Sequence, residues 1–314
     1  MDGMMVATDG IGGAFANPRI VKQGWYVVGT SRGLRGKHPI PVEIGSRRLV
    51  AYRDASNRAH VTSDRCPHLG SDLALADVTE SGLRCVFHGW CWNAEGRCVA
   101  APGNDPLPTR RLATYTTEER WGLVWVWLGG GHAAFDLPLP PDGLPHRVRL
   151  LPQTVNAHAE VIFSNVFDGA HFASSHDVEA STISLDVDGP WRIAHAVGGR
   201  LPKRVHLLPL GLSNTPVEAT FTQHGGGIVI VDVRRPLKYA IYFTIRPDAQ
   251  GRARCRTTLF LRRMTDAPRA AALLWSFVIS DIPLMETIRW TSAYAAGDEV
   301  LKAYARFVEA MPTW

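Results

Sequence analysis

The sequence predicts an α+β protein in which an all-β N-terminal domain precedes a domain with an antiparallel sheet and C-terminal helices. Three observations support this prediction. Over the first 130 or so residues, β-branched and aromatic runs such as GWYVVGT, RRLVAYRD, AHVTSD and WGLVWVWLGG alternate with turn sequences, and no helical period is present. A helix-like segment around 156–172 then precedes strand patterns such as GIVIVDVRR and KYAIYFTIRP. Helical patterns follow from about Pro268 to Met311.

A proline-rich stretch separates the two halves. Residues 136–152, DLPLPPDGLPHRVRLLP, hold five prolines, which break helices and central strands. We therefore predict an N-terminal domain over 1–140 and a second domain over 141–314.

Composition excludes several classes of protein. The net charge of +5 over 314 residues is too small to indicate nucleic-acid binding, and a solvated surface explains it better than docking of an acidic partner. We expect no membrane helix, because no run of about 18 apolar residues occurs. The five cysteines and the lack of a secretory leader favour a reducing cytoplasm over a disulfide framework.

Cysteine and histidine occur as two spaced pairs in CPHLGSDLALADVTESGLRCVFHGW, residues 66–90. The pairs are Cys66 with His68 and Cys85 with His88, so the predicted ligand loops lie near 66–70 and 85–89. Zinc could bind all four side chains tetrahedrally. A [2Fe–2S] cluster could instead take two thiolates on one iron and two imidazoles on the other. The mixed order within each pair favours the cluster, because each loop then contributes one ligand to each iron. Unligated core cysteines with surface histidines are the remaining alternative.

The pattern CPH…CVFHGW closely resembles the Rieske ligand motif. This resemblance implies that Cys66 and Cys85 hold one iron, and that His68 and His88 hold the other. The other three cysteines, Cys91, Cys98 and Cys255, match no ligand position, and we predict that they are core residues.

A second group of candidate ligands lies in NVFDGAHFASSH, residues 165–176. On a helix, Asp168 and His171 lie about 60° apart, whereas His171 and His176 lie about 140° apart. An unbroken helix would not direct both histidines at one metal. We therefore expect the backbone to loosen between them, at Ala173-Ser174-Ser175.

This segment resembles the N-x-x-D-x-x-H-x₄-H pattern of the Rieske non-haem iron oxygenases, and both motifs together extend the resemblance over nearly the whole chain. It implies a helix-grip, START-related fold for the second domain. It also implies that His171 and His176 bind a mononuclear iron. Asp168 then hydrogen-bonds an iron-binding histidine and a Rieske histidine of a neighbouring subunit. Asn165 matches a family position near the iron.

The resemblance places the carboxylate ligand much further along the chain. Asp281 in SDIPLMETI is the best match, by its D-x₄-E spacing to Glu286. An acidic side chain inside the apolar helix ALLWSFVISDIPLM would be costly to bury without a cation. A helix-end role for Asp281 just ahead of Pro283, and Glu286 as the ligand, are the alternatives.

The implied activity is that of a terminal oxygenase. The resemblance implies a [2Fe–2S] cluster, Fe(II), O₂, and electrons from a ferredoxin or an NAD(P)H-dependent reductase. It also implies a homotrimer. The expected reaction is hydroxylation or oxidative demethylation of a small, largely apolar ring-containing molecule. Desaturation or cyclisation, dihydroxylation, and a Rieske electron-transfer or ligand-binding protein are the alternatives. The chain itself lacks a GxGxxG fingerprint in a strand–helix context, so nicotinamide binding is not expected.

Apolar residues of the second half are candidates for a substrate pocket, although each could equally be core. They are Phe163, Val166, Ile228, Ile230, Ile241, Phe243 and Trp275. Four histidines have no ligand spacing and are expected to be surface or core residues: His158, His195, His206 and His224.

Overall fold

The computed structural model describes residues 13–17, 20–35, 38–103, 106–178, 180–203 and 210–314. It divides into two compact units, one of residues 25–134 with Trp314 and one of residues 1–24 with 135–313. The N-terminal segment therefore groups with the second half, whereas the sequence placed it with the first. Hydrogen bonds tie this segment to residues near the C-terminal end of the chain. Gln23 N–H donates to Pro312 O at 2.8 Å, and Lys22 Nζ donates to Met311 O at 2.9 Å.

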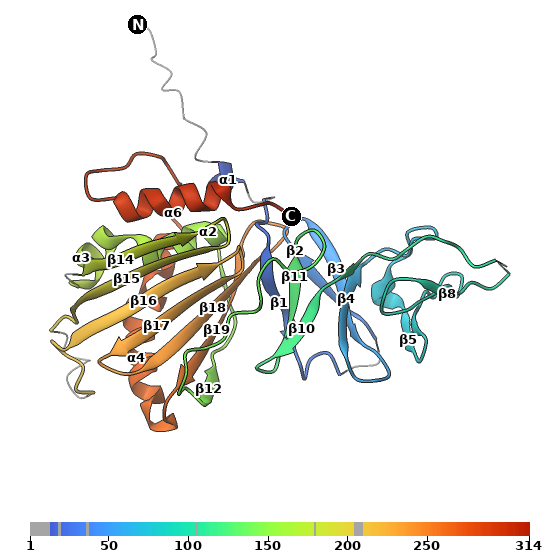
Figure 1. Ribbon diagram of the computed structural model, residues 1–314, viewed down its shortest axis with the longest axis horizontal. Helices are drawn as coiled ribbons and strands as arrows, with labels where there is room; N and C mark the ends of the chain where they lie inside the picture. Colours follow the sequence, from blue (N-terminus) through green and yellow to red (C-terminus); the bar gives the residue numbers. More distant parts are fainter. Residues whose placement is uncertain (1–12, 18–19, 36–37, 104–105, 179, 204–209) are drawn as a thin grey trace, which may run out of the picture. The chain divides into compact units, whose positions relative to one another are not determined.

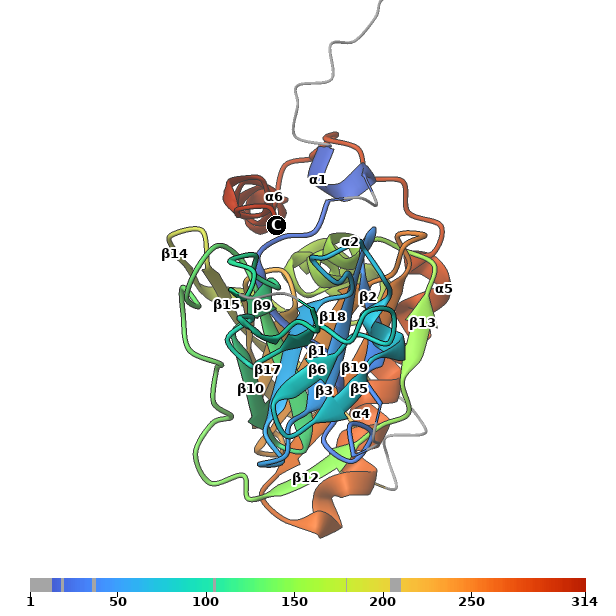
Figure 2. The same ribbon diagram turned by 90° about the vertical axis from the view of Figure 1, so that its right-hand side faces the viewer.

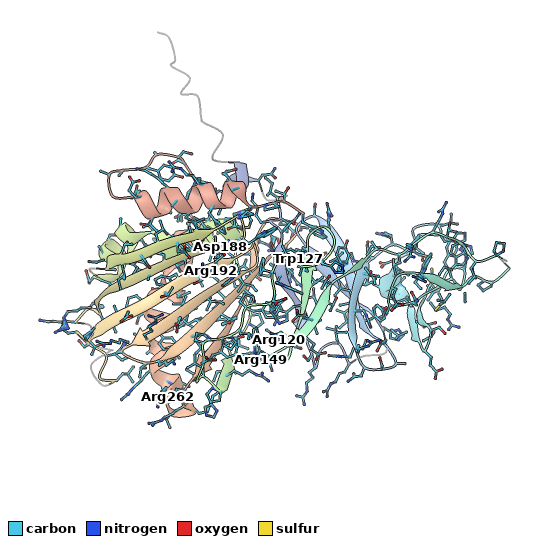
Figure 3. The ribbon with its side chains drawn as sticks, in the orientation of Figure 1. Arg120, Trp127, Arg149, Asp188, Arg192 and Arg262 are labelled. Carbon is cyan, nitrogen blue, oxygen red and sulfur yellow. The ribbon has the colours of Figure 1, made fainter. Side chains whose placement is uncertain are left out.

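Among its described residues, the unit of residues 25–134 contains only strands, loops and one short 3₁₀ turn, η2 (Leu73–Leu75). Its antiparallel strands form three small sheets: β1 (Gly24–Thr30), β11 (Leu123–Leu128) and β10 (Thr117–Arg120); β2 (Ile40–Ile44), β3 (Arg47–Arg53), β4 (Ala59–Ser63) and β9 (Thr114–Tyr115); β5 (Asp77–Thr79), β6 (Gly82–Arg84), β7 (Cys91–Trp92) and β8 (Cys98–Ala100). Every residue of β11 is buried, including Trp127, which Figure 3 labels. The four strand runs read from the sequence are confirmed as β1, β3, β4 and β11.

The second unit is built on one long antiparallel sheet, in which sequence neighbours lie side by side from β14 to β19 (Figure 1). Its strands are β12 (His146–Arg149), β13 (Gln153–Val155), β14 (Ser181–Asp188), β15 (Arg192–Arg200), β16 (Pro216–His224), β17 (Ile228–Arg235), β18 (Tyr239–Pro247) and β19 (Ala253–Leu261). Strand β13 pairs with β19, Gln153 opposite Cys255. This mixture of antiparallel sheet and helices confirms the α+β prediction.

Short helices cover one face of this sheet, and Figure 2 shows α4 and α5 on the same side of it. In the described part of this unit, the helices and 3₁₀ turns are α1 (Gly13–Ala16), α2 (Ala159–Ser164), η3 (Asn165–Phe167), α3 (Gly169–His176), η5 (Met264–Asp266), α4 (Ala267–Phe277), η6 (Ile279–Asp281), α5 (Ile282–Met285) and α6 (Glu299–Ala310). No helix of the described residues is long and apolar enough to cross a membrane.

The structure interrupts both predicted helical regions. The segment expected around 156–172 is divided into α2, η3 and α3, because Asp168 adopts an extended conformation between them. The apolar helix expected around Asp281 ends at Phe277, and α5 begins as a separate turn with Pro283 in its first positions. Proline is favoured there because its missing N–H would be unpaired in a first turn anyway. Asp281 thus lies at a junction between helices and not inside one.

A buried carboxyl joins α2 to the rest of this unit. Glu160 Oε2 accepts hydrogen bonds from Gln223 Nε2 at 3.0 Å and from the Tyr304 hydroxyl at 2.9 Å. Burial raises the pKa of Glu160 to about 7, although these bonds and the charge of Lys22 act in the opposite direction. The folded protein therefore binds a proton here that the unfolded chain releases near its ordinary pKa of 4.5.

This site predicts a loss of stability with rising pH. Because the pKa of Glu160 is raised in the folded state, the contribution of protonated Glu160 to stability is fully present below about pH 4.5. It is lost as the pH rises through about 7. The loss is on the order of 3 kcal/mol in the free energy of unfolding. Glu160→Gln keeps an oxygen for both hydrogen bonds and cannot ionise, so it should flatten this dependence. Urea midpoints of both proteins at about pH 5 and about pH 8 test this. An equal change in urea midpoint between the two pH values for both proteins would contradict this prediction.

Candidate metal centres

The two cysteine–histidine pairs lie on two loops of the same construction. Gly70 N–H donates to Cys66 O at 2.8 Å, and Gly89 N–H donates to Cys85 O at 3.0 Å. Both glycines have a left-handed backbone, with φ of 77° and 71°. Such a conformation is strained for other residues. Each loop therefore turns back four residues after its cysteine, and the turn holds the intervening histidine beside it.

The side chains of the four residues gather by type. The Cys66 and Cys85 thiols are buried and interact with each other, and burial raises the pKa of the Cys66 thiol. The His68 and His88 rings lie 4.7 Å apart between centroids. His68 Nδ1 is buried and has no hydrogen-bond partner, so a nitrogen is left free for a metal. Two adjacent thiols and two adjacent imidazoles fit a [2Fe–2S] cluster with a different ligand pair on each iron.

The same arrangement does not fit zinc. Four ligands on one tetrahedral zinc ion lie roughly 3.3–3.8 Å from one another. Within the described part of the chain, no three of the donor atoms from Cys66, His68, Cys85 and His88 lie within 4.8 Å of one another. They therefore do not converge on a single ion.

Aromatic and apolar side chains surround the loops. The Trp90 ring stacks on His68 at 4.0 Å between centroids and 3° between planes. Cys91 and Cys98 are buried, as expected for core residues, whereas Cys255 is half-buried in β19 of the other unit.

Three side chains converge in the second unit. Asp281 Oδ2 lies 3.1 Å from His171 Nε2 and 3.0 Å from His176 Nε2, and the two Nε2 atoms are 3.0 Å apart. Asp281 is 2% exposed. Burial by itself would raise the pKa of Asp281, but hydrogen bonds with His171, His176 and Asn165 outweigh it and hold the pKa well below its usual range. The carboxylate is therefore ionised while buried.

These distances fit a facial set of ligands on one metal ion. Two ligand atoms at right angles on an ion, each with a bond of about 2.1 Å, are about 3.0 Å apart. All three separations agree with this value. Two histidines and one carboxylate are the ligand set of non-haem Fe(II) sites that keep positions open. Glu286 takes no part in this group, since its Oε1 accepts the N–H of Asn156 at 2.8 Å.

Helix α3 brings the histidines together by a wide last turn. The helix continues to His176, so it is not broken at Ala173-Ser174-Ser175. Asp177, in the left-handed conformation with φ of 54°, donates its N–H to Phe172 O, five residues earlier. Such a bond widens the turn. The expected loosening is thus located at the C-terminal end of the helix.

Two further predicted residues adjoin the triad. Asn165 Nδ2 donates to Asp281 Oδ2 at 2.9 Å and so orients the carboxylate. Asp168 is the N-cap of α3, where its Oδ1 accepts the N–H of His171 at 3.0 Å. This contact positions the helix turn that carries His171. The bond from Asp168 to a histidine of a neighbouring subunit stays a prediction.

An apolar cavity of about 160 Å³ lies between the sheet and the helices and reaches Asn165. Four of the predicted pocket residues line it: Phe163, Val166, Ile241 and Phe243.

The other three candidates do not line the cavity: Ile228 and Ile230 are buried core residues, as the sequence equally allowed, and Trp275 is exposed. The two isoleucines share one face of β17, but the cavity face is that of Val229, Val231 and Val233. A shift of one residue along a strand moves every side chain to the other face. Trp275 is 67% exposed, and α4 instead presents Leu273 and Leu274.

The remaining histidines do not form a metal group in the described residues. His158 Nδ1 accepts the Glu160 N–H at 3.2 Å at the start of α2, and buried His195 bonds Thr182 at 3.0 Å. Burial lowers the pKa of His224 to about 4. His206 lies outside the described residues.

Comparison with known proteins finds one family description and several similar proteins and solved structures. The family description "Rieske [2Fe-2S] domain" matches residues 24–115. Aminopyrrolnitrin oxygenase PrnD of Pseudomonas fluorescens is 30% identical over 280 residues, an alignment covering 76% of this chain and 75% of that protein. Among solved structures, dicamba monooxygenase bound to dicamba has a TM-score of 0.67 at 18% identity and covers 94% of this chain and 97% of its own. NdmA of Pseudomonas putida with caffeine has a TM-score of 0.71 at 20% identity, with coverage of 91% and 89%.

Proposed function

The chain belongs to the Rieske non-haem iron oxygenases, and we propose from this that it is a terminal oxygenase acting on a small, largely apolar ring-containing molecule. The observation that carries the proposal is the convergence of His171, His176 and Asp281 beside an apolar cavity. When bound, a [2Fe–2S] cluster supplies electrons and a mononuclear Fe(II) activates O₂.

The side chains of this chain have separate tasks in such a reaction. Cys66, His68, Cys85 and His88 hold the cluster, and His171, His176 and Asp281 hold the iron. Asn165 supports the second group: it keeps Asp281 oriented through its 2.9 Å hydrogen bond, and it also lines the cavity, so it lies between the triad and the substrate. The apolar lining excludes water from the reacting position and orients a ring by contact.

Hydroxylation or oxidative demethylation is the proposed reaction, and desaturation or cyclisation and dihydroxylation by the same iron centre are the alternatives. A protein that only carries electrons or binds a ligand would not need a second group of converging ligands. The buried, ionised Asp281 between two histidines therefore favours an oxygenase.

The proposed electron donors are a ferredoxin or an NAD(P)H-dependent reductase, and the proposed assembly is a homotrimer. Exposed apolar side chains at the cluster loops support contacts between proteins, since Leu69 is 67% exposed and Phe87 is 61% exposed. The proposed compartment is a reducing cytoplasm, and the free thiols of Cys91, Cys98 and Cys255, which are not cluster ligands, support it.

Iron content and product analysis test this function together. Protein purified without oxygen should hold about three iron atoms per chain, two in the cluster and one at the triad. With a reductase, it should incorporate oxygen from O₂ into a member of a panel of methoxylated aromatics, sterols and heterocycles. About two irons per chain with no oxidised product would instead identify an electron carrier.

A further inference from the structure

The cavity beside the triad has no charged side chain among the described residues that line it. Its polar lining is limited to five side chains, those of Gln153, Asn165, Tyr239, Cys255 and Thr257. A carboxylate, sulfonate or ammonium group taken into such a cavity would lose its hydration without meeting a charged side chain of the lining, which is unfavourable. A neutral group with one hydrogen bond loses much less.

Tyr239 differs from the other polar lining residues. It is 4% exposed, and it lies on the cavity face of β18, where its Cα partners are Val233 and Leu261. No hydrogen-bond partner of its hydroxyl is found within the part of the chain that the structure describes. Burial raises the pKa of Tyr239, so the phenol keeps its proton and remains a donor.

The other donors are already engaged or can reach water. One N–H of the half-buried Asn165 amide is bonded to Asp281, and the Cys255 thiol contacts Ala253 O at 3.8 Å. Gln153 is exposed and Thr257 is half-buried. Tyr239 is therefore the buried donor that a bound molecule would satisfy, because an unpaired hydroxyl in an apolar site is unfavourable.

We propose that the cavity selects an uncharged, hydrophobic ring compound that carries a neutral hydrogen-bond acceptor, and that the Tyr239 hydroxyl donates to this acceptor. The acceptor is a carbonyl, ether or ring nitrogen. The inference rests on the proposed function, since it names the substrate class of that site.

Binding of three matched probes tests both parts of the proposal. The probes are 2-acetylnaphthalene, which is neutral with an acceptor, 2-ethylnaphthalene, which has no acceptor, and 2-naphthoate, which is charged. Equilibrium dialysis uses the holoenzyme without O₂ or reductant. The expected order is 2-acetylnaphthalene tightest, with 2-naphthoate weaker by at least about tenfold.

Two tyrosine variants separate the hydroxyl from general packing. Tyr239→Phe should weaken 2-acetylnaphthalene about five- to tenfold and leave 2-ethylnaphthalene unchanged. Tyr242→Phe is the matched control, because Tyr242 lies three residues after Tyr239 on the same strand and does not line the cavity. Its hydroxyl donates to Pro138 O at 3.3 Å. It should change neither affinity. The Rieske visible spectrum of each variant reports that it is folded.

A charged variant provides a second test that does not depend on Tyr239. Thr257→Lys places a cation in the lining, and 2-naphthoate should then bind more tightly than 2-acetylnaphthalene. The proposal is overturned if wild-type protein binds none of the probes, binds 2-naphthoate as tightly as the ketone, or loses no selectivity for the ketone in Tyr239→Phe.

The binding results are independent of turnover. Selective binding of the ketone by a protein that oxidises nothing would support the substrate class and reject the oxygenase function. Efficient oxidation of aromatic carboxylates would support the oxygenase function and reject the substrate class.

Discussion

Asp281→Ala is expected to lower substrate oxidation by more than about a hundredfold, because even partners of metal ligands cost 10–100-fold when removed. The Asp281 carboxylate is the only negative charge in the converging group, and it lies 3.0–3.1 Å from both histidine Nε2 atoms. Without it, only two imidazoles remain as ligands, which bind Fe(II) poorly. Iron content should fall from about three to about two per chain, and the Rieske visible spectrum should stay unchanged.

Glu286→Gln is the matched control for this experiment. Glu286 is the nearby acidic residue that the sequence offered as a rival ligand. It accepts a hydrogen bond from the Asn156 N–H and lies outside the triad. Its variant should keep the third iron and the activity. Loss of iron in Glu286→Gln with retention in Asp281→Ala would reverse the ligand assignment. Loss of the cluster spectrum in Asp281→Ala would show a general folding defect.

Asp168→Asn is expected to leave both metals bound and to slow single-turnover electron transfer to the triad by about 10–100-fold. Asparagine is as good an N-cap as aspartate, so the bond from His171 N–H, now 3.0 Å, should survive. Only the negative charge is lost. Stopped-flow oxidation of the reduced cluster in the presence of substrate and O₂ measures the rate.

Asp168→Ala separates capping from charge. It removes the cap as well, at a cost of about 0.5–2 kcal/mol in helix stability, and should loosen the turn that carries His171. If Asp168→Asn transferred electrons at the wild-type rate while Asp168→Ala did not, Asp168 would be a helix cap and not a link between centres. Full activity in both variants would remove Asp168 from the site altogether.

Much of the fold was predictable from local patterns, and the residues of both sites were predictable from their resemblance to a family motif. The strands β1, β3, β4 and β11 follow from alternation of apolar and β-branched residues. The boundaries of α3 were less accessible, because the sequence does not show that Asp168 leaves the helical conformation to cap it. The helix break before Asp281 depends on Pro283 and on an irregular Val278, whose φ is −124°. The sequence showed the proline, but not that the chain restarts there.

The face of β17 shows where periodicity stops being informative. Alternation places Ile228 and Ile230 together, and Val229 and Val231 together, but both faces of this strand are buried. With apolar residues on both faces, hydrophobicity cannot tell which one borders the cavity. The answer depends on the pairing with β18, where Val229 lies opposite Phe243 and Val231 opposite Ile241.

The sequence by itself determined the elements whose ligands are close together along the chain, which are the paired loops of Cys66 and Cys85 and the two histidines of α3. Their spacing acts through the local backbone, so it can be read without the fold. The resemblance offered Asp281 as the carboxylate ligand with Glu286 as its rival, and only the tertiary structure brings Asp281, 110 residues beyond His171, to these histidines. It also places Tyr239 on the same cavity, with no hydrogen-bond partner of its hydroxyl among the described residues. Those contacts arise from packing of helices on a sheet, which local spacing does not encode.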